Sequence, residues 1–373
     1  MSDTIVHDEV TNLKKLPLHK EHERLGARIG AFGSWLVPIQ YTSIIEEHQA
    51  VRHSVGIFDI SHMGEFFVSG ANARRLVNQW ITNDIEKLWP GRILYSPVCR
   101  ENGGTVDDVL VYEMAVDRYL IVVNASNVEK DFAWFGSHRS LDVVLQDKSP
   151  ETGMLSVQGP LSKDLVEKVF SRNLAGLAYY HFQAFQTDLG EIILSETGYT
   201  GEKGYEIFCP IHQVVTLWQR FFEHGAPMGL KPIGFGARDT LRLEAKMCLY
   251  GHELTDDITP LEAGLSWAIG WGKEDFIGFE ALKRQREAGL KHKLVGFEIV
   301  GRGIAREGCV LKVNEDAVGR VTSGTYSPTL KKNIGLGLIA VPYSQVGQNI
   351  DVEVRGNLHP AKIIQTPFYK RQK

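Results

Sequence analysis

Residues 102–115 read NGGTVDDVLVYEMA, and this stretch predicts a β-strand around which the neighbouring chain is organised. A turn containing two glycines leads into a run rich in β-branched residues, which is typical of strands. Because side chains alternate between the two faces of a strand, Asp107 and Asp108 point in opposite directions. Asp108 shares its face with Val106 and Leu110, so the pattern predicts a carboxylate on an apolar face.

A carboxylate on an apolar face has to be hydrogen-bonded, paired with a positive charge, or raised in pKa. Asp108 is therefore a candidate for handling a proton in a reaction. The alternative is a structural aspartate whose charge is paired at the end of the strand. The alternation of side chains does not separate these two interpretations.

A second strand follows at once. Asp117 and Arg118 predict a tight turn, after which residues 119–125 are apolar up to Asn124. The strand that carries Asp108 is thus predicted to be half of a hairpin, with Asn124 at the far end of its partner strand.

Helical spacing and strand patterns place further elements along the chain. Helices are expected near residues 18–25, 43–53, 71–80, 162–170, 214–225 and 235–246, and strands near 64–68, 92–99, 154–158, 190–197 and 205–209. Residues 126–150 are expected to be helix plus loop. Short strands near 294–300, 308–313, 317–322, 334–341 and 350–355, separated by turn residues, predict a β-sandwich or barrel-like C-terminal domain.

Composition limits the class of protein. A chain of 373 residues with 43% hydrophobic and 23% charged residues is typical of a soluble globular protein with two or three domains. The net charge of -4 gives no nucleic-acid footprint, and no apolar run approaches the ~20 residues of a membrane span. The polar, partly acidic N-terminus resembles no targeting peptide.

Cysteine and histidine spacing argues against several kinds of site. The four cysteines lie far apart, which is typical of a reducing compartment such as the cytoplasm and indicates neither zinc nor a disulfide framework. His48, His53 and His62 have no spacing that forms a metal triad, and no serine sits in a GxSxG motif. The cysteines are Cys99, Cys209, Cys248 and Cys309.

The segment GYTGEKGYE, residues 198–206, is dense in glycine. It matches neither the Rossmann fingerprint nor the P-loop, and its acidic residues disfavour phosphate. One interpretation is a plain hairpin loop. The other is a turn that presents Tyr199 and Glu206 to a ring with donor edges, since a carboxylate accepts two parallel hydrogen bonds from such a ring.

The segment GARDTLRLEA, residues 236–245, predicts a helix that places Arg238 and Arg242 on one face. Like charges four residues apart repel each other unless an anion lies nearby. That anion is either a carboxylate of the same helix, a carboxylate elsewhere such as Glu206, or a ligand.

Five motifs together closely resemble the T-proteins of the glycine cleavage system, which are aminomethyltransferases. The resemblance runs from about Leu16 to Tyr369. The motifs, in order, are FDISHMGE (58–65), NGGTVDD (102–108), GYTGEKGYE (198–206), GARDTLRLEA (236–245) and TSGTYSPTL (322–330).

The resemblance implies a reaction. A lipoylated partner, the H-protein, carries an aminomethyl group on the sulfur of its reduced lipoyl arm. The enzyme transfers the one-carbon unit to its co-substrate tetrahydrofolate, giving 5,10-methylenetetrahydrofolate, ammonia and dihydrolipoyl H-protein. Asp108 matches the family's key aspartate, which acts on the folate nitrogens and the developing iminium-like carbon. Proton transfer and electrostatic stabilisation both remain open as its role.

The same motif matching implies the folate-binding residues. Glu206 is expected to take the amino edge of the pterin, with Tyr199 beside it and Arg238 completing the polar cluster. The remaining positions are expected to line the folate cavity, at which the Asp108 hairpin and the Glu206 loop converge; they are Met63, Tyr95, Tyr112, Asn124 and, as a weaker match, Tyr369.

The fold implied is α+β, a three-domain cloverleaf folate-binding aminomethyltransferase fold with a C-terminal β-barrel or sandwich-like domain. We expect a flexible extension over residues 1–16, a discontinuous first domain over 17–55 and about 150–260, a second domain over 56–149, and the β-domain over about 280–373. The chain has FGSW at 32–35 where the family usually has FAGW, and Thr105 where a bulkier apolar residue is usual.

Two other functions use the same fold. A relative could demethylate an S- or N-methyl compound onto tetrahydrofolate without an H-protein. A non-enzymatic folate-binding protein would bind folate without turnover, although the complete set of motifs argues against it. Ammonia release that depends on tetrahydrofolate and loaded H-protein separates these alternatives from the main hypothesis.

Overall fold

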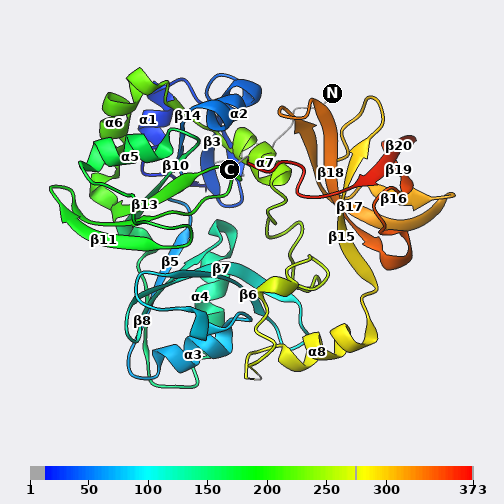
Figure 1. The fold of residues 1–373 in the computed structure, drawn as a ribbon, viewed down its shortest axis with the longest axis horizontal. Helices are drawn as coiled ribbons and strands as arrows, with labels where there is room; N and C mark the ends of the chain where they lie inside the picture. The colour runs from blue at the N-terminus through cyan, green and yellow to red at the C-terminus, as the bar shows by residue number, and fades with distance from the viewer. Residues whose placement is uncertain (1–12, 274, 372–373) are drawn as a thin grey trace. The chain divides into compact units, whose positions relative to one another are not determined.

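The structure is a computed structural model that describes residues 13–273 and 275–371. The chain, many of whose elements are labelled in Figure 1, divides into two compact units built from separate stretches of sequence. The first unit comprises Met1–Gly64, Lys148–Gly198 and Glu202–Asp239, and the second comprises Glu65–Asp147, Tyr199–Gly201 and Thr240–Lys373.

The first unit is built on a six-stranded sheet with the order β11-β12-β13-β10-β4-β14. Its neighbours pair antiparallel except for β14, which runs parallel to β4. The strands are β4 (Gly56–Asp59), β10 (Thr152–Gln158), β11 (Phe182–Thr187), β12 (Gly190–Ser195), β13 (Gly204–Pro210) and β14 (Lys231–Pro232). The helices are α1 (His19–Arg24), α2 (Ile44–His53), α5 (Ser162–Phe170) and α6 (Val214–Gly225), and α7 (Phe235–Glu244) begins in this unit.

A small sheet with the order β1-β3-β2 belongs to the same unit. Its strands are β1 (Lys14–Lys15), β2 (Arg28–Phe32) and β3 (Trp35–Gln40). The extension predicted over residues 1–16 lies outside the described residues as far as residue 12. After that point β1 pairs in parallel with β3 and Leu16 is buried, so regular structure begins before the predicted boundary.

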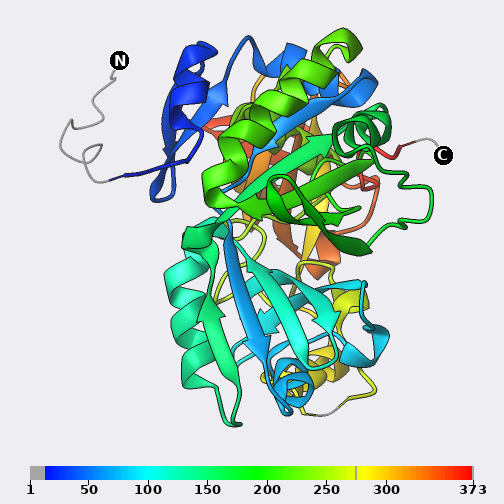
Figure 2. The ribbon, with the colours of Figure 1, turned by 90° about the vertical axis from the view of Figure 1, so that its left-hand side faces the viewer.

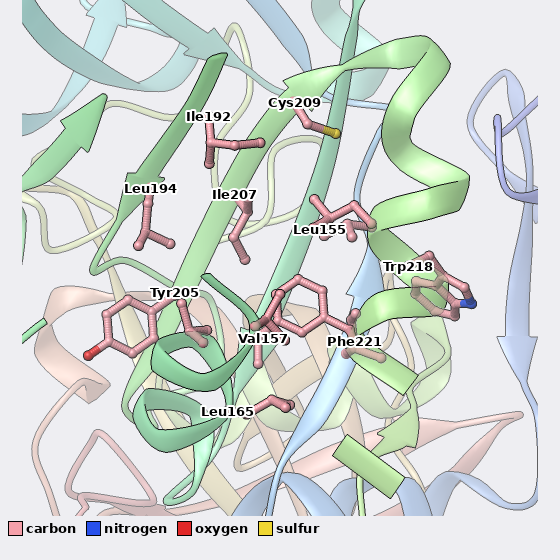
Figure 3. Close-up of a cluster of buried hydrophobic side chains, with 14 of the residues drawn as sticks. Leu155, Val157, Leu165, Ile192, Leu194, Tyr205, Ile207, Cys209, Trp218 and Phe221 are labelled. Carbon is pink, nitrogen blue, oxygen red and sulfur yellow. The ribbon is translucent and has the colours of Figure 1, made fainter. Parts of the chain in front are cut away.

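The core of the first unit lies between the six-stranded sheet and helices α5 and α6 (Figure 3). Leu155 and Val157 of β10 and Ile207 of β13 pack there against Leu165 and Trp218 of the helices. Because strand side chains alternate, the residues between them, including Glu206, belong to the opposite face of the sheet. Burial of the apolar face therefore fixes the side from which Glu206 projects.

The second unit contains a five-stranded sheet with the order β6-β7-β8-β5-β9. Figure 2 shows helix α4 lying along this sheet, and its Trp134 and Phe135 pack in the same core as Val109 and Val111 of β7. The elements are β5 (Gly64–Ser69), α3 (Ala73–Trp80), β6 (Ile93–Cys99), β7 (Thr105–Ala115), β8 (Arg118–Val123), α4 (Val128–Ser137) and β9 (Val144–Asp147). Strand β9 falls within the region predicted as helix plus loop, so that prediction was incomplete.

Six strands in the C-terminal part of the second unit close into a barrel with the order β15-β18-β17-β16-β19-β20. This confirms the predicted β-domain. The strands are β15 (His292–Ile299), β16 (Val310–Val313), β17 (Asp316–Ser327), β18 (Lys332–Ala340), β19 (Asn349–Val354) and β20 (Asn357–Ile364), and helix α8 (Phe279–Ala288) precedes them. The sequence had not indicated β20, which contains Pro360, a residue that disfavours strands.

Short 3-10 helices complete the described chain. They are η2 (Ile85–Lys87), η3 (Ala125–Asn127), η4 (Ser149–Glu151), η5 (Ile211–Gln213), η6 (Ala226–Met228), η7 (Ser266–Ala268) and η8 (Val341–Tyr343). Among residues 13–273 and 275–371, no helix is long and apolar enough to cross a membrane.

Candidate functional site

The hairpin of β7 and β8 presents the two aspartates. Strand β7 lies between β6 and β8 and pairs antiparallel with both. The tight turn before β8 has Asp117 in the left-handed region, with φ of 56°. Asn124 follows the last residue of β8 directly, so the predicted hairpin and the predicted place of Asn124 are both confirmed.

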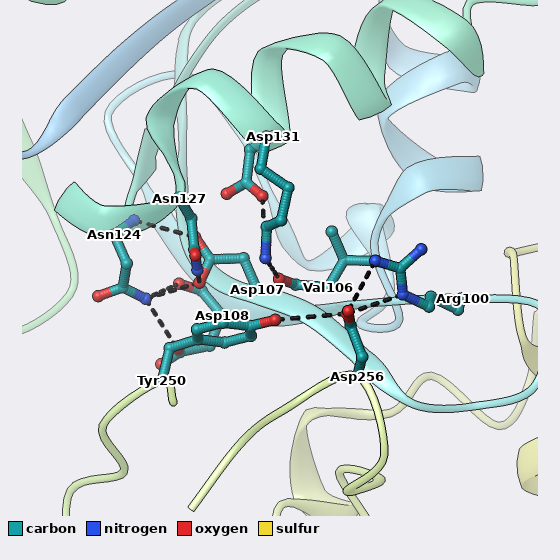
Figure 4. A network of polar contacts seen from close by, with 10 residues as sticks. Arg100, Val106, Asp107, Asp108, Asn124, Asn127, Asp131, Tyr250 and Asp256 are labelled. Carbon is teal, nitrogen blue, oxygen red and sulfur yellow. Dashed lines mark hydrogen bonds and ion pairs between the residues drawn. The ribbon is translucent and has the colours of Figure 1, made fainter. Parts of the chain in front are cut away.

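Asp107 is completely buried and is held by three N–H donors (Figure 4). Its Oδ1 accepts hydrogen bonds from the side-chain amides of Asn124 and Asn127, each at 2.8 Å, and its Oδ2 accepts one from the Asn124 backbone N–H at 2.9 Å. Donors of this kind favour the ionised carboxylate.

Asp108 is only partly buried, and its two oxygens have separate partners. Oδ1 accepts a hydrogen bond from Asn124 Nδ2 at 2.9 Å, and Oδ2 accepts one from the Tyr95 hydroxyl at 3.0 Å. One amide group of Asn124 therefore bridges the two aspartates. Tyr95 also stacks on Trp267, with ring centroids 5.4 Å apart.

The electrostatic surroundings of Asp108 favour its protonated form. Burial and, after it, the negative charge of Asp107 raise the pKa of Asp108 from 3.8 to about 7, against the opposing hydrogen bonds from Tyr95 and Asn124. Both protonation states are thus within reach near neutral pH.

Burial of the two aspartates differs from the sequence-based expectation. Alternation singled out Asp108 as the carboxylate on the apolar face, yet Asp107 is the more deeply buried of the two. The reason is that α4 packs on the other face of β7, where Val109 and Val111, on the Asp107 side, are core residues together with Trp134 and Phe135. Alternation assigns side chains to two faces, but it does not tell which of two apolar faces a helix covers.

A stability prediction follows from the Asp108 pKa. Because folding raises the pKa of Asp108, the protonated form of Asp108 stabilises the folded protein. This stabilisation is lost as the pH rises from 3.8 towards about 7. We expect Asp108→Asn to remove this decline and to be more stable than wild type above that range. We count only half of the Asp108 pKa shift, because the side chain is partly exposed. The expected gain in the free energy of unfolding is then about 2 kcal/mol. Urea unfolding of both proteins across this pH range measures the difference, and parallel curves would contradict it.

The loop that leads into β7 depends on Gly104. A Cβ atom at this position would lie 1.7 Å from the backbone oxygen of Asp256. The same aspartate is held by its side chain, since Arg100 Nε donates to its Oδ1 at 2.7 Å and Nη2 donates to its Oδ2 at 2.9 Å.

We expect Gly104→Ala to lower the free energy of unfolding by roughly 3 kcal/mol, because the backbones must separate. Gly136→Ala is the matched control, since nothing lies within 4 Å of a Cβ there and the site is an exposed helix position. That control is expected to change stability by less than about 1 kcal/mol. Urea denaturation measures both, and equal midpoints for the two variants would contradict the close approach.

A second polar cluster lies in the first unit around Glu206 of β13. Glu206 is 6% exposed, and its Oε2 accepts a hydrogen bond from Thr197 Oγ1 at 2.5 Å. Burial raises the pKa of Glu206, while the Thr197 hydrogen bond and the positive charge of Arg238 lower it. The charge of Arg238 therefore acts on Glu206. Glu206 was one of the anions that the sequence left open as partners of the two arginines.

His62 and Met63 lie in the loop between β4 and β5. Burial, followed by the charge of Arg238, lowers the pKa of His62 to about 3, so its imidazole is neutral near pH 7. The ring packs against Phe32 and Phe235 at centroid distances of 6.0 and 4.9 Å. Met63 itself is partly exposed.

Two glycines of the 198–206 segment pack closely on β10. A Cβ atom on Gly198 or on Gly204 would lie 2.1 or 2.2 Å from the Gln158 side chain. Gln158 Nε2 in turn donates to Thr197 O at 3.1 Å. Because these glycines lack side chains, the backbone on both sides of the turn packs closely against Gln158. This packing positions the start of β13.

The other predicted positions belong to the second unit. Tyr112 is completely buried in β7, and the Tyr199 hydroxyl donates a hydrogen bond to Cys248 O. The backbone N–H of Tyr369 donates to Glu244 O at 2.8 Å. Their roles toward folate stay predictions.

Arg242 has partners outside its own helix. Its Nη1 donates to Glu253 Oε2 at 2.8 Å and its Nη2 donates to Ser323 Oγ at 2.8 Å, with both charged groups buried. The neighbouring Glu244 accepts hydrogen bonds from the Ser327 and Thr329 hydroxyls. This arginine is therefore held in a structural ion pair.

Sequence reasoning missed three residues of the Asp107–Asp108 network: Asn127, Lys130 and Asp131. Lys130 Nζ donates to Val106 O and lies 4.0 Å from the Tyr250 ring centroid. Asp131 precedes the core residues Trp134 and Phe135 by three and four positions. That spacing places Asp131 on the apolar face of a helix and is the signal that could have revealed it. Across the described ranges, no group of three or more His, Cys, Asp or Glu could hold a metal ion.

Known proteins resemble the chain over nearly its whole length. Residues 18–273 match the GCVT N-terminal domain, and residues 292–370 match the glycine cleavage T-protein C-terminal barrel domain. An aminomethyltransferase of Geobacillus sp. is 48% identical over 363 residues, covering 97% of this chain and 100% of that protein. One of Desulforamulus reducens is 46% identical over 360 residues, covering 96% and 99% respectively.

A solved structure agrees with these matches. The glycine cleavage system aminomethyltransferase T from Bartonella henselae is 31% identical with a TM-score of 0.91, covering 96% of this chain and 98% of that one. The mixed α and β fold with its C-terminal barrel is thereby confirmed. The chain therefore belongs to the glycine cleavage T-protein family, the aminomethyltransferases of the glycine cleavage system.

Proposed function

We propose that this family member transfers a one-carbon unit from aminomethyl-loaded, lipoylated H-protein to tetrahydrofolate. The products are 5,10-methylenetetrahydrofolate, ammonia and dihydrolipoyl H-protein. The observation that carries the proposal is the bridge that Asn124 makes between two aspartates, one buried and held by N–H donors and the other partly exposed with a pKa of about 7. We place the reaction in the cytoplasm, where the four free cysteines would remain reduced.

Asp108 is the catalytic residue in this proposal. As the carbon–sulfur bond of the aminomethyl donor breaks, positive charge develops on an iminium-like carbon, and an ionised carboxylate stabilises it. Asn124 and Tyr95 hold one Asp108 oxygen each, so the carboxylate has a fixed orientation. Activity is accordingly expected to rise with the ionisation of Asp108.

Glu206 is the principal pterin ligand in this proposal. A carboxylate accepts two parallel hydrogen bonds from the amino edge of a pterin ring, as it does from a guanidinium group. The Thr197 hydrogen bond and the positive charge of Arg238 oppose the rise that burial causes in the pKa of Glu206. Met63, Tyr112, Tyr199 and Tyr369 are proposed as further folate contacts.

Ammonia release tests this function. The protein is mixed with aminomethyl-loaded H-protein, and ammonia is measured with and without tetrahydrofolate. We expect rapid release only when both are present. Folate-dependent methyl loss from a small S- or N-methyl donor, without ammonia release from the loaded H-protein, would overturn the proposal in favour of a demethylase. Folate binding without any turnover would overturn it in favour of a binding protein.

A further inference from the structure

Asp131 is a buried carboxyl group that the proposed reaction does not use. It lies in α4, and 1% of its side chain is exposed. Neither of its oxygens accepts a hydrogen bond from an N–H group or a hydroxyl of the described residues. Lys130 Nζ lies 3.6 Å from Oδ1, an ion-pair distance beyond hydrogen-bond reach, and donates to Val106 O instead. An ionised carboxylate in this environment would be strongly disfavoured.

The neighbouring carboxyl group is Asp107, whose negative charge and side chain both act on Asp131. Two carboxyl groups in contact can form a hydrogen bond only when one of them carries a proton. Asp107 already accepts three N–H hydrogen bonds, which favour its ionised form. The proton of the pair therefore belongs on Asp131.

Electrostatics agree with this assignment. Burial, then the charge of Asp107, then the hydrogen bond between the two groups raise the pKa of Asp131 far above its usual value. The charge of Lys130 opposes these effects. The other titratable groups that interact with the cluster directly are Tyr95, Cys248 and Tyr250. Asp256, which Arg100 binds, accepts a hydrogen bond from Tyr250.

We propose that Asp131 is a positioning residue for Asp108: as a neutral acid it donates a hydrogen bond to the Asp107 carboxylate and holds that carboxylate in place. Figure 4 shows the consequence for the network, because Asn124 Nδ2 donates to both Asp107 and Asp108. A displaced Asp107 would take Asn124 with it and so release one Asp108 oxygen. The inference rests on the proposed role of Asp108.

Three variants separate the neutral acid from a charged or merely space-filling residue. Asp131→Asn keeps a hydrogen-bond donor toward Asp107, and Asp131→Leu fills the same space without a donor. Asp107→Asn, by contrast, removes a negative charge from the network. We expect Asp131→Leu to lower kcat about tenfold with a nearly unchanged KM for tetrahydrofolate, since one positioning hydrogen bond is lost. Asp131→Asn is expected to restore most of that loss. Equal kcat values for the two Asp131 variants would overturn the positioning role.

The pH profile supplies a readout that a structural role would not change. Asp107→Asn is expected to move the acidic limb of the kcat profile by about one unit to lower pH, because its charge raises the pKa of Asp108. Asp131→Asn is expected to leave the midpoint in place, since it replaces a neutral group. A shift of the Asp131→Asn profile toward lower pH would show that Asp131 is ionised and would overturn the proposal.

An infrared difference spectrum tests the protonation state without turnover. Wild type minus Asp131→Asn is recorded at about pH 9, where an ordinary aspartate is ionised. We expect the carbonyl band of a protonated carboxylic acid, and its absence would overturn the Asp131 proposal alone. Full activity of Asp108→Asn would instead overturn the proposed function, so the two failures are distinguishable even if Asp131→Leu does not fold.

Discussion

Asp108→Asn is expected to lower kcat for one-carbon transfer by about 10²- to 10⁴-fold, the range typical of removing a charge that stabilises a transition state. Asparagine fills the same space and still offers an oxygen to the Tyr95 hydroxyl or the Asn124 amide. It cannot, however, supply the negative charge that an iminium-like carbon needs. Steady-state assay of ammonia release with saturating tetrahydrofolate measures the loss.

Two controls make this result specific. Asp316→Asn makes the same chemical change at an exposed position at the start of β17, and is expected to retain wild-type activity. The unfolding midpoint of Asp108→Asn is expected to equal or exceed that of wild type near neutral pH, for the reason given by the Asp108 pKa. A stable Asp108→Asn protein with near-normal turnover would refute the role of Asp108.

Glu206→Gln is expected to raise the KM for tetrahydrofolate by about 10- to 100-fold, with kcat changed by less than about threefold. The loss of charge-assisted hydrogen bonds to a ring costs about 1.5–3 kcal/mol, and this interaction is the same in the ground and transition states. Initial rates over a range of tetrahydrofolate concentrations separate the two constants.

Glu191→Gln is the matched control for this second experiment. It lies on the neighbouring strand β12 but is exposed, so it is expected to leave both constants unchanged. Glu206→Gln with a normal KM and a reduced kcat would show that Glu206 acts in the chemical step. Normal values of both constants would contradict any contact with the pterin.

Local sequence patterns were sufficient for the Asp108 hairpin. The glycine turn, the β-branched run and the turn at Asp117 are all determined by residues close together in the chain. The same patterns misjudged which aspartate is more deeply buried, because they contain no information on which face of the strand α4 covers. Strand β20 was missed because it contains a proline, a residue that disfavours strands. It nevertheless pairs with both of its neighbours, β15 and β19.

The contacts that complete each cluster are non-local. Asp131 reaches Asp107 from a helix 24 positions further along, and Arg100 pairs with Asp256 across 156 positions. Helical spacing indicates that Asp131 faces the core, but only the packing of α4 on its sheet shows which residue it meets. Arg242 illustrates the same limit, since its position on α7 does not reveal Glu253 as its partner.

The most direct test of the account is a single-turnover reaction of the protein with aminomethyl-loaded H-protein and tetrahydrofolate, followed at once for ammonia and for 5,10-methylenetetrahydrofolate. The account predicts that both products appear at the same rate in a one-to-one ratio, and that both rates fall together in Asp108→Asn. Ammonia that appears without the folate product, or equal rates in wild type and Asp108→Asn, would contradict it.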